Sequence, residues 1–239
     1  MGLIEPPGQP VTGRDDVPFP PHSPIPGTYT SLQPLSLSHS SSLFNHLGSD
    51  ANARLWTYLS RHPPADQASC DTLIAAWSAS RDPQYYAVVV PESESDHETA
   101  GTPLGIMALL NIVPEHRRLE IGWVILGAAL QRTRPATEAF YLLLRRSFDE
   151  LGYQRVEWKA NALNAASLTA AERLGFVSEG TFRKHIICKG KWRDTAWFSV
   201  TDDDWPIVKM GFEAWLDPGN FDEAGRQKRG LRECREACK

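Results

Sequence analysis

The sequence predicts an α/β fold, in which a central β-sheet is flanked by helices. Two consecutive strand–turn–helix units carry this prediction. In the first unit, the apolar run over residues 119–126 predicts a strand, and residues 137–151 repeat apolar side chains at helical spacing. In the second unit, a strand expected over residues 155–160 precedes a short helix that ends at Leu174, Gly175 and Phe176. Each strand therefore leads into a helix, as in an α/β protein.

Shorter patterns on both sides of these units predict further elements. The β-branched and aromatic residues of 85–90 predict a strand, and residues 69–71 can cap a helix over residues 72–79. The other elements expected are strands over residues 29–35 and 104–113 and helices over residues 38–47, 51–59 and 207–216, the last of them capped by Asp202, Asp203 and Asp204.

The chain of 239 residues is expected to form one domain with two distinct ends. Residues 1–27 contain eight of the eighteen prolines, which prevents a helix or a central strand there. We expect an extended or disordered leader, with a Pro-rich partner site as the alternative. The folded domain is expected over residues 28–217. Residues 218–239 are highly charged and are expected to form a tail that frays or adds a loose helix.

Composition argues against several classes of protein. The net charge of −4 and the pI near 6.0 disfavour a protein that binds nucleic acid mainly through phosphate contacts. No apolar run reaches the ~18 residues that cross a membrane, and the N-terminus lacks the pattern of a secretory signal. Four scattered cysteines without neighbouring histidines indicate free thiols rather than a metal site, and hence a cytoplasmic location. A monomer and a homodimer both remain open.

The turn between residues 126 and 137 is the strongest functional signal. It is rich in small and basic residues and leads into a helix, so backbone N–H groups and the positive end of the helix dipole would meet there. Pyrophosphate suits such a junction, and arginine side chains would add bidentate contacts. A basic surface loop is the alternative. The residues expected to bind are Gln131, Arg132, Thr133, Arg134, Ala136 and Thr137.

Four motifs occur in a fixed order along the chain. They are Glu120-Ile121-Gly122 on a strand, the turn that begins at Gln131, the pair Asn164 and Ser167, and Leu174-Gly175-Phe176. This order resembles the GNAT superfamily of acyl-CoA N-acyltransferases, and within it the branch of ribosomal-protein N-terminal acetyltransferases and spermidine acetyltransferase. The resemblance covers residues 29–200 and is most specific over residues 119–179. It implies a mixed, splayed sheet with acetyl-CoA in the split, and two antiparallel strands over residues 179–188 and 195–200.

The resemblance also implies which residues of the turn contact acetyl-CoA. Gln131 and Ala136 match the family pattern, whereas Arg134 stands where glycine is common. Glycine permits close approach and unusual dihedral angles, which arginine does not. Pro135 suits the first helical turn but lacks an N–H donor. Arg132 and Arg134 are expected to compensate through their charged side chains.

Three further contacts with acetyl-CoA follow from the resemblance. The pair Asn164 and Ser167 matches a family pattern that contacts the pantetheine or phosphate region, although helix capping by Asn164 explains it equally well. A backbone N–H of the strand near Trp123, Val124 and Ile125 is expected to bind the thioester oxygen.

Direct acetyl transfer to an amine needs a base for the ammonium and an acid for the departing thiolate. Glu120 is the candidate base, by the resemblance, and a structural salt bridge to Arg117, Arg118 or Lys159 is the alternative. Many relatives supply the acid from a tyrosine, but this chain has none after Tyr153. Ser167, Cys188 or water is then the expected acid, with a reaction that needs no acid as the alternative.

The expected function is acetyl-CoA-dependent N-acetylation of a primary amine on a small molecule or an amino acid derivative. Two alternatives remain open: a protein N-terminus as the acceptor, and a non-catalytic module that binds acyl-CoA. Trp123, Trp158, Trp192 and Trp197 could line an acceptor pocket, with core packing as the alternative for at least two of them.

Overall fold

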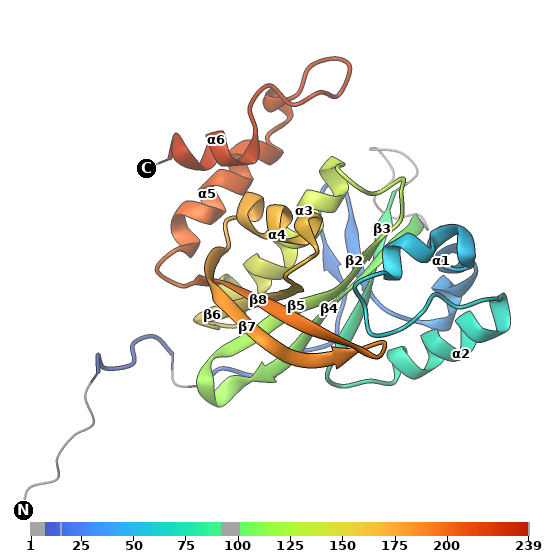
Figure 1. Ribbon diagram of the computed structural model, residues 1–239. Coiled ribbons are helices and arrows are strands. Elements are labelled where there is room, and N and C mark those ends of the chain that lie inside the picture. The colour runs from blue at the N-terminus through green and yellow to red at the C-terminus, as the bar shows by residue number, and fades with distance from the viewer. Residues whose placement is uncertain (1–7, 15, 92–100, 239) are drawn as a thin grey trace, which may run out of the picture.

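The computed structural model describes residues 8–14, 16–91 and 101–238 (Figure 1). Within these residues, eight strands form one sheet in the order β1-β2-β3-β4-β5-β6-β8-β7. Neighbouring strands pair antiparallel, except β5 and β6, which run parallel. A mixed sheet with helices on both faces confirms the predicted α/β fold.

Most elements lie where the sequence predicts them. The strands are β1 (Ile25–Pro26), β2 (Ser31–Pro34), β3 (Gln84–Val90), β4 (Thr102–Val113), β5 (Arg118–Leu126), β6 (Arg155–Asn161), β7 (Val177–Cys188) and β8 (Lys191–Thr201). The α-helices are α1 (Ser40–Leu47), α2 (Gln67–Ser78), α3 (Arg134–Arg145), α4 (Ala165–Leu174), α5 (Trp205–Leu216) and α6 (Leu231–Glu236). Shorter turns are η1 (Leu37–His39), η2 (Asp50–Trp56), η3 (Pro114–His116), η5 (Pro218–Asn220) and the π-helical η4 (Arg146–Glu150). No helix among the described residues is long and apolar enough to cross a membrane.

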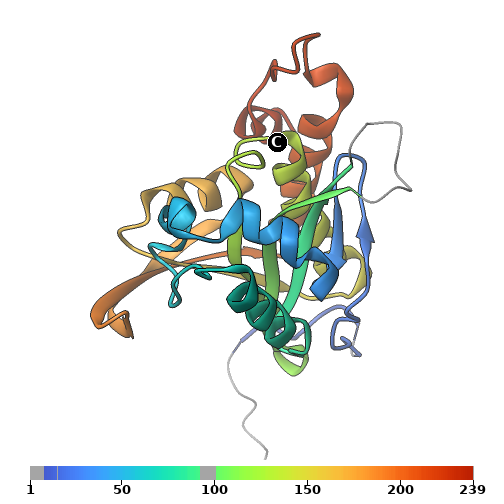
Figure 2. The same ribbon diagram turned by 90° about the vertical axis from the view of Figure 1, so that its right-hand side faces the viewer.

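The sheet separates two hydrophobic cores. Helices α3, α4 and α5 cover one face, where Leu143 and Leu144 of α3 are fully buried. Helices α1 and α2 cover part of the other face (Figure 2), where Ile74 and Trp77 pack against Tyr85 of β3. Helices α1 and α2 do not cover the whole of that face along β5, β6, β8 and β7 (Figure 1). The buried polar residues Glu120, Glu157, Thr195 and Ser199 lie on these strands. This polar part of the face is where the candidate site lies.

The helix expected over residues 51–59 is a 3₁₀ helix over residues 50–56 rather than an α-helix. The chain there forms 3₁₀ turns, η2, because its side chains bond backward to the end of α1 instead of supporting a helical ladder. The Trp56 indole N–H donates to the Leu47 carbonyl at 2.7 Å, and the Asn52 amide donates to the Gly48 carbonyl at 2.8 Å.

Helix α3 starts earlier than the expected residue 137. Thr133 is its N-cap, since the Thr133 hydroxyl accepts from the Ala136 N–H at 3.2 Å, and Pro135 occupies the first turn. The helix then continues from Arg146 as the π-helical turn η4. The positive end of α3 therefore lies within the basic turn itself.

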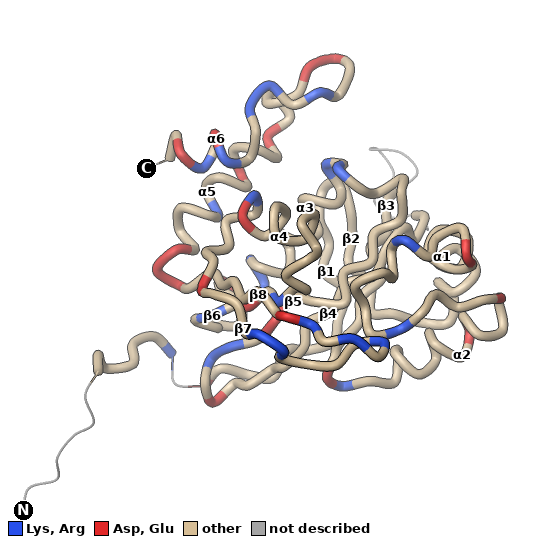
Figure 3. The backbone as a smooth tube through the Cα atoms, in the orientation of Figure 1, with Lys and Arg blue, Asp and Glu red and all other residues tan. Residues whose placement is uncertain are grey.

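Both ends of the chain contribute to the fold beyond residues 28–217. Within the expected leader, Ile25 is buried and β1 pairs with β2. Within the expected tail, the segment after α5 alternates basic and acidic residues (Figure 3), yet Leu231 and Cys234 of α6 are buried in the main core. Helix α6 packs on α5 and α4.

Candidate active site

The sheet opens between its two parallel strands. Strands β5 and β6 pair only where Arg118, Leu119 and Glu120 face residues 155–157. Beyond Glu120, β5 stays paired with β4, and β6 stays paired with β8. The two strands therefore diverge from Glu120 onward, which confirms the splayed sheet.

Strand β5 carries a bulge beside this opening. Gly122 pairs with Ala108 and Ile125 pairs with Ile106, so Trp123 and Val124 together face a single residue of β4. Trp123 has a left-handed backbone with φ of 49°. A bulge leaves one residue unpaired in the ladder, which supplies a backbone N–H next to the opening. Val124 is half-buried, whereas the Ile125 side chain packs in the core under α1 and α2.

The turn before α3 presents several unbonded N–H groups. The backbone N–H groups of Arg132, Thr133 and Arg134 have no acceptor among the residues that the structure describes. Arg132 has a left-handed backbone with φ of 62°, and its side chain is exposed. The Gln131 amide donates to the Leu126 carbonyl at 2.8 Å and so ties the turn to the end of β5. Consecutive free N–H groups at a helix start form an anion-binding site.

Arg134 lies in helix α3 rather than in the turn before it, where the sequence had placed it. The left-handed residue of the turn is Arg132, and Arg134 itself has entered the helix. Its guanidinium stacks on the rings of Phe221 and Tyr29, with centroid distances of 3.6 and 4.6 Å. Its side chain thus packs against the C-terminal segment, while its backbone N–H lies beside the N–H groups of the turn.

Thr137 and Ala136 are buried at the start of α3. The Thr137 hydroxyl lies 3.3 Å from the Thr133 carbonyl and 3.3 Å from both terminal nitrogens of Arg173 on α4. Thr137 therefore joins α3 to α4.

The start of α4 lies after β6, next to the opening. The Asn164 side chain accepts from the Ser167 N–H at 3.3 Å and caps the helix. The Ser167 hydroxyl accepts from the Trp158 indole N–H at 3.0 Å, which leaves its own proton available. Asn164 therefore caps helix α4, which was one of the two roles expected for it.

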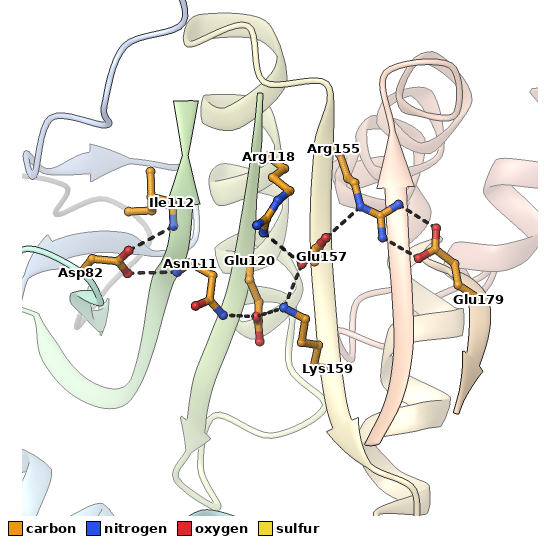
Figure 4. A network of polar contacts seen from close by, with 9 residues as sticks. All are labelled: Asp82, Asn111, Ile112, Arg118, Glu120, Arg155, Glu157, Lys159 and Glu179. Atoms are coloured by element: carbon orange, nitrogen blue, oxygen red, sulfur yellow. Dashed lines mark hydrogen bonds and ion pairs between the residues drawn. The ribbon is translucent and has the colours of Figure 1, made fainter. Parts of the chain in front are cut away.

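Glu120 lies at the apex of the opening, inside a polar network (Figure 4). Its Oε2 atom accepts from Lys159 Nζ at 2.7 Å and from the Asn111 amide at 2.7 Å. The residue is buried on the polar face of the sheet. Of the three cations considered as partners, Lys159 is the one that pairs with it.

The network continues across β6 to β7 (Figure 4). Lys159 also pairs with Glu157 at 2.8 Å, and Arg155 bridges Glu157 and Glu179. Burial opposes ionisation of Glu157, but the hydrogen bonds from Lys159 and Arg155 outweigh it and lower its pKa. The Arg155 hydrogen bond lowers the pKa of Glu179 to about 2, against the cost of burial.

We expect the free energy of unfolding to decrease at acid pH because Glu179 becomes protonated. A carboxyl whose pKa is lower in the folded chain contributes stability above the unfolded value of 4.5, and this contribution is lost as the pH falls toward 2. Because Glu179 is partly exposed, solvent screening reduces the effect. Urea unfolding of the wild type and Glu179→Gln should differ at pH 6 and converge only as the pH approaches about 2. A constant difference at every pH would contradict this account.

The four candidate pocket tryptophans have different surroundings. Trp158 packs in the main core, and Trp123 packs beside the second core. Trp192 is exposed. Trp197 carries Lys159 over its ring at 4.2 Å and lies on the polar face. Core packing therefore accounts for two of them.

Sequence reasoning missed Asn111 and Glu157 of this face, and it gave Arg193, noted with Asp194 as resembling a family feature, no role at the site. The alternation of Arg155, Glu157 and Lys159 along β6 was a usable signal, because it predicts a charged face on that strand. Asn111 and Arg193 lie on other strands and carry no such local pattern.

The chain is similar to proteins of one family. The GNAT acetyltransferase domain family matches residues 30–177. A solved GCN5-related N-acetyltransferase from Brucella melitensis is 40% identical, with a TM-score of 0.86 over 92% of this chain and 96% of that chain.

Two relatives come from Bacillus subtilis (strain 168). YokL, a prophage-derived uncharacterised N-acetyltransferase, is 36% identical over 72 residues, which are 30% of this chain and only 41% of YokL. YdaF, a candidate ribosomal N-acetyltransferase, is 26% identical over 150 residues, which are 63% of this chain and 78% of YdaF.

These similarities agree with the geometry of the chain. The matched residues 30–177 include the opening between β5 and β6, the turn before α3 and the start of α4. Family members take their acyl group from acetyl-CoA. The chain belongs to the GNAT acetyltransferase family and is an acyltransferase.

Proposed function

We propose that this acyltransferase moves the acetyl group of acetyl-CoA directly to a primary amine of a small molecule or an amino acid derivative, in the cytoplasm. In the net reaction a C–N bond forms and the C–S bond of the thioester breaks. The amine gives up protons, one of which returns to the sulfur of CoA, and N-acetyl amine and free CoA thiol are released.

The turn before α3 carries the proposal, because it fits the donor. The free N–H groups of Arg132, Thr133 and Arg134 lie at the positive end of α3, and the exposed Arg132 side chain adds a permanent cation. These groups would hold the pyrophosphate. Acetyl-CoA supplies the activated thioester when it is bound.

Residues beside the opening would serve the chemistry. The bulge at Trp123 and Val124 would offer an N–H to the carbonyl oxygen, where negative charge develops. Glu120, which accepts hydrogen bonds from Lys159 and Asn111, would take the ammonium proton, directly or through water. The Ser167 hydroxyl, which accepts from Trp158 and keeps its own proton, would serve as the acid.

Calorimetric titration with acetyl-CoA tests the donor site. We expect micromolar binding to the wild type, and binding at least about tenfold weaker for Arg132→Glu, which places a negative charge beside the phosphates. Arg183→Glu reverses a charge on exposed β7 and should bind normally. Undetectable binding to the wild type, or equal affinity of all three proteins, would contradict the assignment of this turn as the pyrophosphate site.

A protein N-terminus is the second candidate acceptor, because the relative YdaF is named as a candidate ribosomal N-acetyltransferase. Free-thiol release with a panel of amines and of short peptides separates the two candidates. Faster release with small amines supports the first acceptor, and faster release with peptides supports the second.

A further inference from the structure

Two buried hydrogen-bond donors on β8 lack partners. Arg193 Nε and Trp197 Nε1 are both shielded from solvent, and neither has an acceptor within the part of the chain that the structure describes. Buried donors are normally satisfied, because an unmet one costs about 1–3 kcal/mol. Two of them on one strand indicate a group that the protein itself does not supply.

Both side chains lie on the same face of the sheet as Glu120. Residues alternate along β8, so Ala196 and Phe198 enter the main core while Arg193 and Trp197 point to the opposite face. Trp197 pairs with Lys159, whose ammonium lies over the indole ring and also bonds Glu120. The donors therefore belong to the polar face at the opening.

The hairpin of β7 and β8 forms the edge of the sheet beside this face. It extends past the rest of the sheet (Figure 2), and its end is held by the segment after α1. Lys189 Nζ donates to the Trp56 carbonyl at 2.7 Å, and the Cys188 thiol lies 3.5 Å from the Leu59 carbonyl. Arg193 thus lies between the anchored end of the hairpin and the apex at Glu120.

Arg193 differs from the neighbouring cations on β5 and β6 in lacking a carboxylate partner among the described residues. The cations on β5 and β6 have carboxylates: Lys159 pairs with Glu120 and Glu157, Arg155 with Glu157 and Glu179, and Arg118 with Glu157. Arg193 forms no ion pair with any residue in the described ranges. Burial lowers the pKa of Arg193, while the Cys188 and Glu120 charges oppose that change. A guanidinium stays protonated, so Arg193 keeps a positive charge that no carboxylate of the described residues pairs with.

We propose that Arg193 binds a carboxylate of the amine acceptor, so that the substrate is an amine that itself carries an acid group. This inference rests on the proposed function and names its substrate class. The amine would point toward Glu120 and the carboxylate toward Arg193, where a bidentate pair satisfies Nε. The Trp197 N–H donates to a second polar atom of the acceptor.

Matched pairs of acceptors test this assignment. Each pair is an amino acid and its amide, taken from the standard α-amino acids and from ω-amino acids of increasing length. Thiol release should favour the acid over the amide by about tenfold or more in kcat/KM, mainly through KM, since the lost group is a binding contact. The preferred chain length then reports the separation between the amine site and Arg193.

Three variants show whether Arg193 is responsible. Arg193→Gln should abolish the preference for the acid and leave acetyl-CoA affinity unchanged, and Trp197→Phe should weaken both members of a pair alike. Arg183→Gln removes an exposed arginine from the neighbouring strand and should keep the wild-type preference. Equal use of acid and amide by the wild type, or an unchanged preference in Arg193→Gln, would overturn the inference.

Calorimetry separates this inference from the proposed function. The acids and amides are titrated into protein that is saturated with CoA, so no turnover is needed. Tighter binding of the acid that disappears in Arg193→Gln supports the carboxylate site even if no thiol is ever released. Binding that does not distinguish the pair overturns it, even if acetyl-CoA binds well.

Discussion

Replacing Glu138 by alanine is expected to lower the free energy of unfolding by about 3 kcal/mol, because it strips the acceptor from three N–H groups at once. Glu138 is buried on α3, and its carboxylate accepts from the backbone of Thr28, Tyr29 and Thr30 at 2.8, 2.6 and 2.8 Å. These bonds hold the chain between β1 and β2 against the helix. Alanine is the best helix former, so the loss cannot come from α3 itself.

Urea unfolding of the full chain measures this loss. Glu172→Ala is the matched control, since it removes an exposed glutamate from α4 and should change the unfolding free energy by less than about 0.5 kcal/mol. A Glu138→Ala protein as stable as the control would mean that water satisfies the three N–H groups, and that the carboxylate is not needed to hold the segment.

The parts of the fold that the sequence predicted are those set by local pattern. The strand at 119–126, the basic turn and the helix that follows it are contiguous, so apolar spacing and turn composition were enough to place them. The same holds for Asn164, whose capping role depends only on residues three positions away. Family resemblance then supplied the splay of the sheet, which no local pattern encodes.

The parts that escaped prediction depend on pairing between distant segments. Arg134 stacks on Phe221, which lies in a segment expected to be a tail, so its aromatic partner could not be inferred from the turn. Glu120 meets Lys159 only because β5 and β6 pair in one register, and Asn111 joins them from β4. Ile25 enters the core although prolines surround it, because a two-residue edge strand tolerates proline.

Glu120→Gln is expected to lower kcat by about 100-fold while leaving acetyl-CoA affinity unchanged, because glutamine keeps the shape of the side chain but cannot accept a proton. Lys159 retains Glu157 as a partner at 2.8 Å, so the network is not left with an unpaired ammonium. Thiol release against pH gives the mechanistic readout: the activity of the variant should depend more steeply on pH than that of the wild type and rise toward the pKa of the acceptor ammonium, because only the unprotonated amine can then react.

Glu157→Gln separates chemistry from charge at this site. This variant also removes one negative charge from the network, at the residue that pairs with Glu120 across the two strands. Glu157 differs from Glu120 in its surroundings, because it forms ion pairs with Lys159, Arg155 and Arg118. We therefore expect kcat within a few-fold of the wild type and an unchanged pH profile. If both variants lose the same activity and keep the same profile, the carboxylates act together as a structural ion network. The ammonium of the acceptor would then have to lose its proton to water.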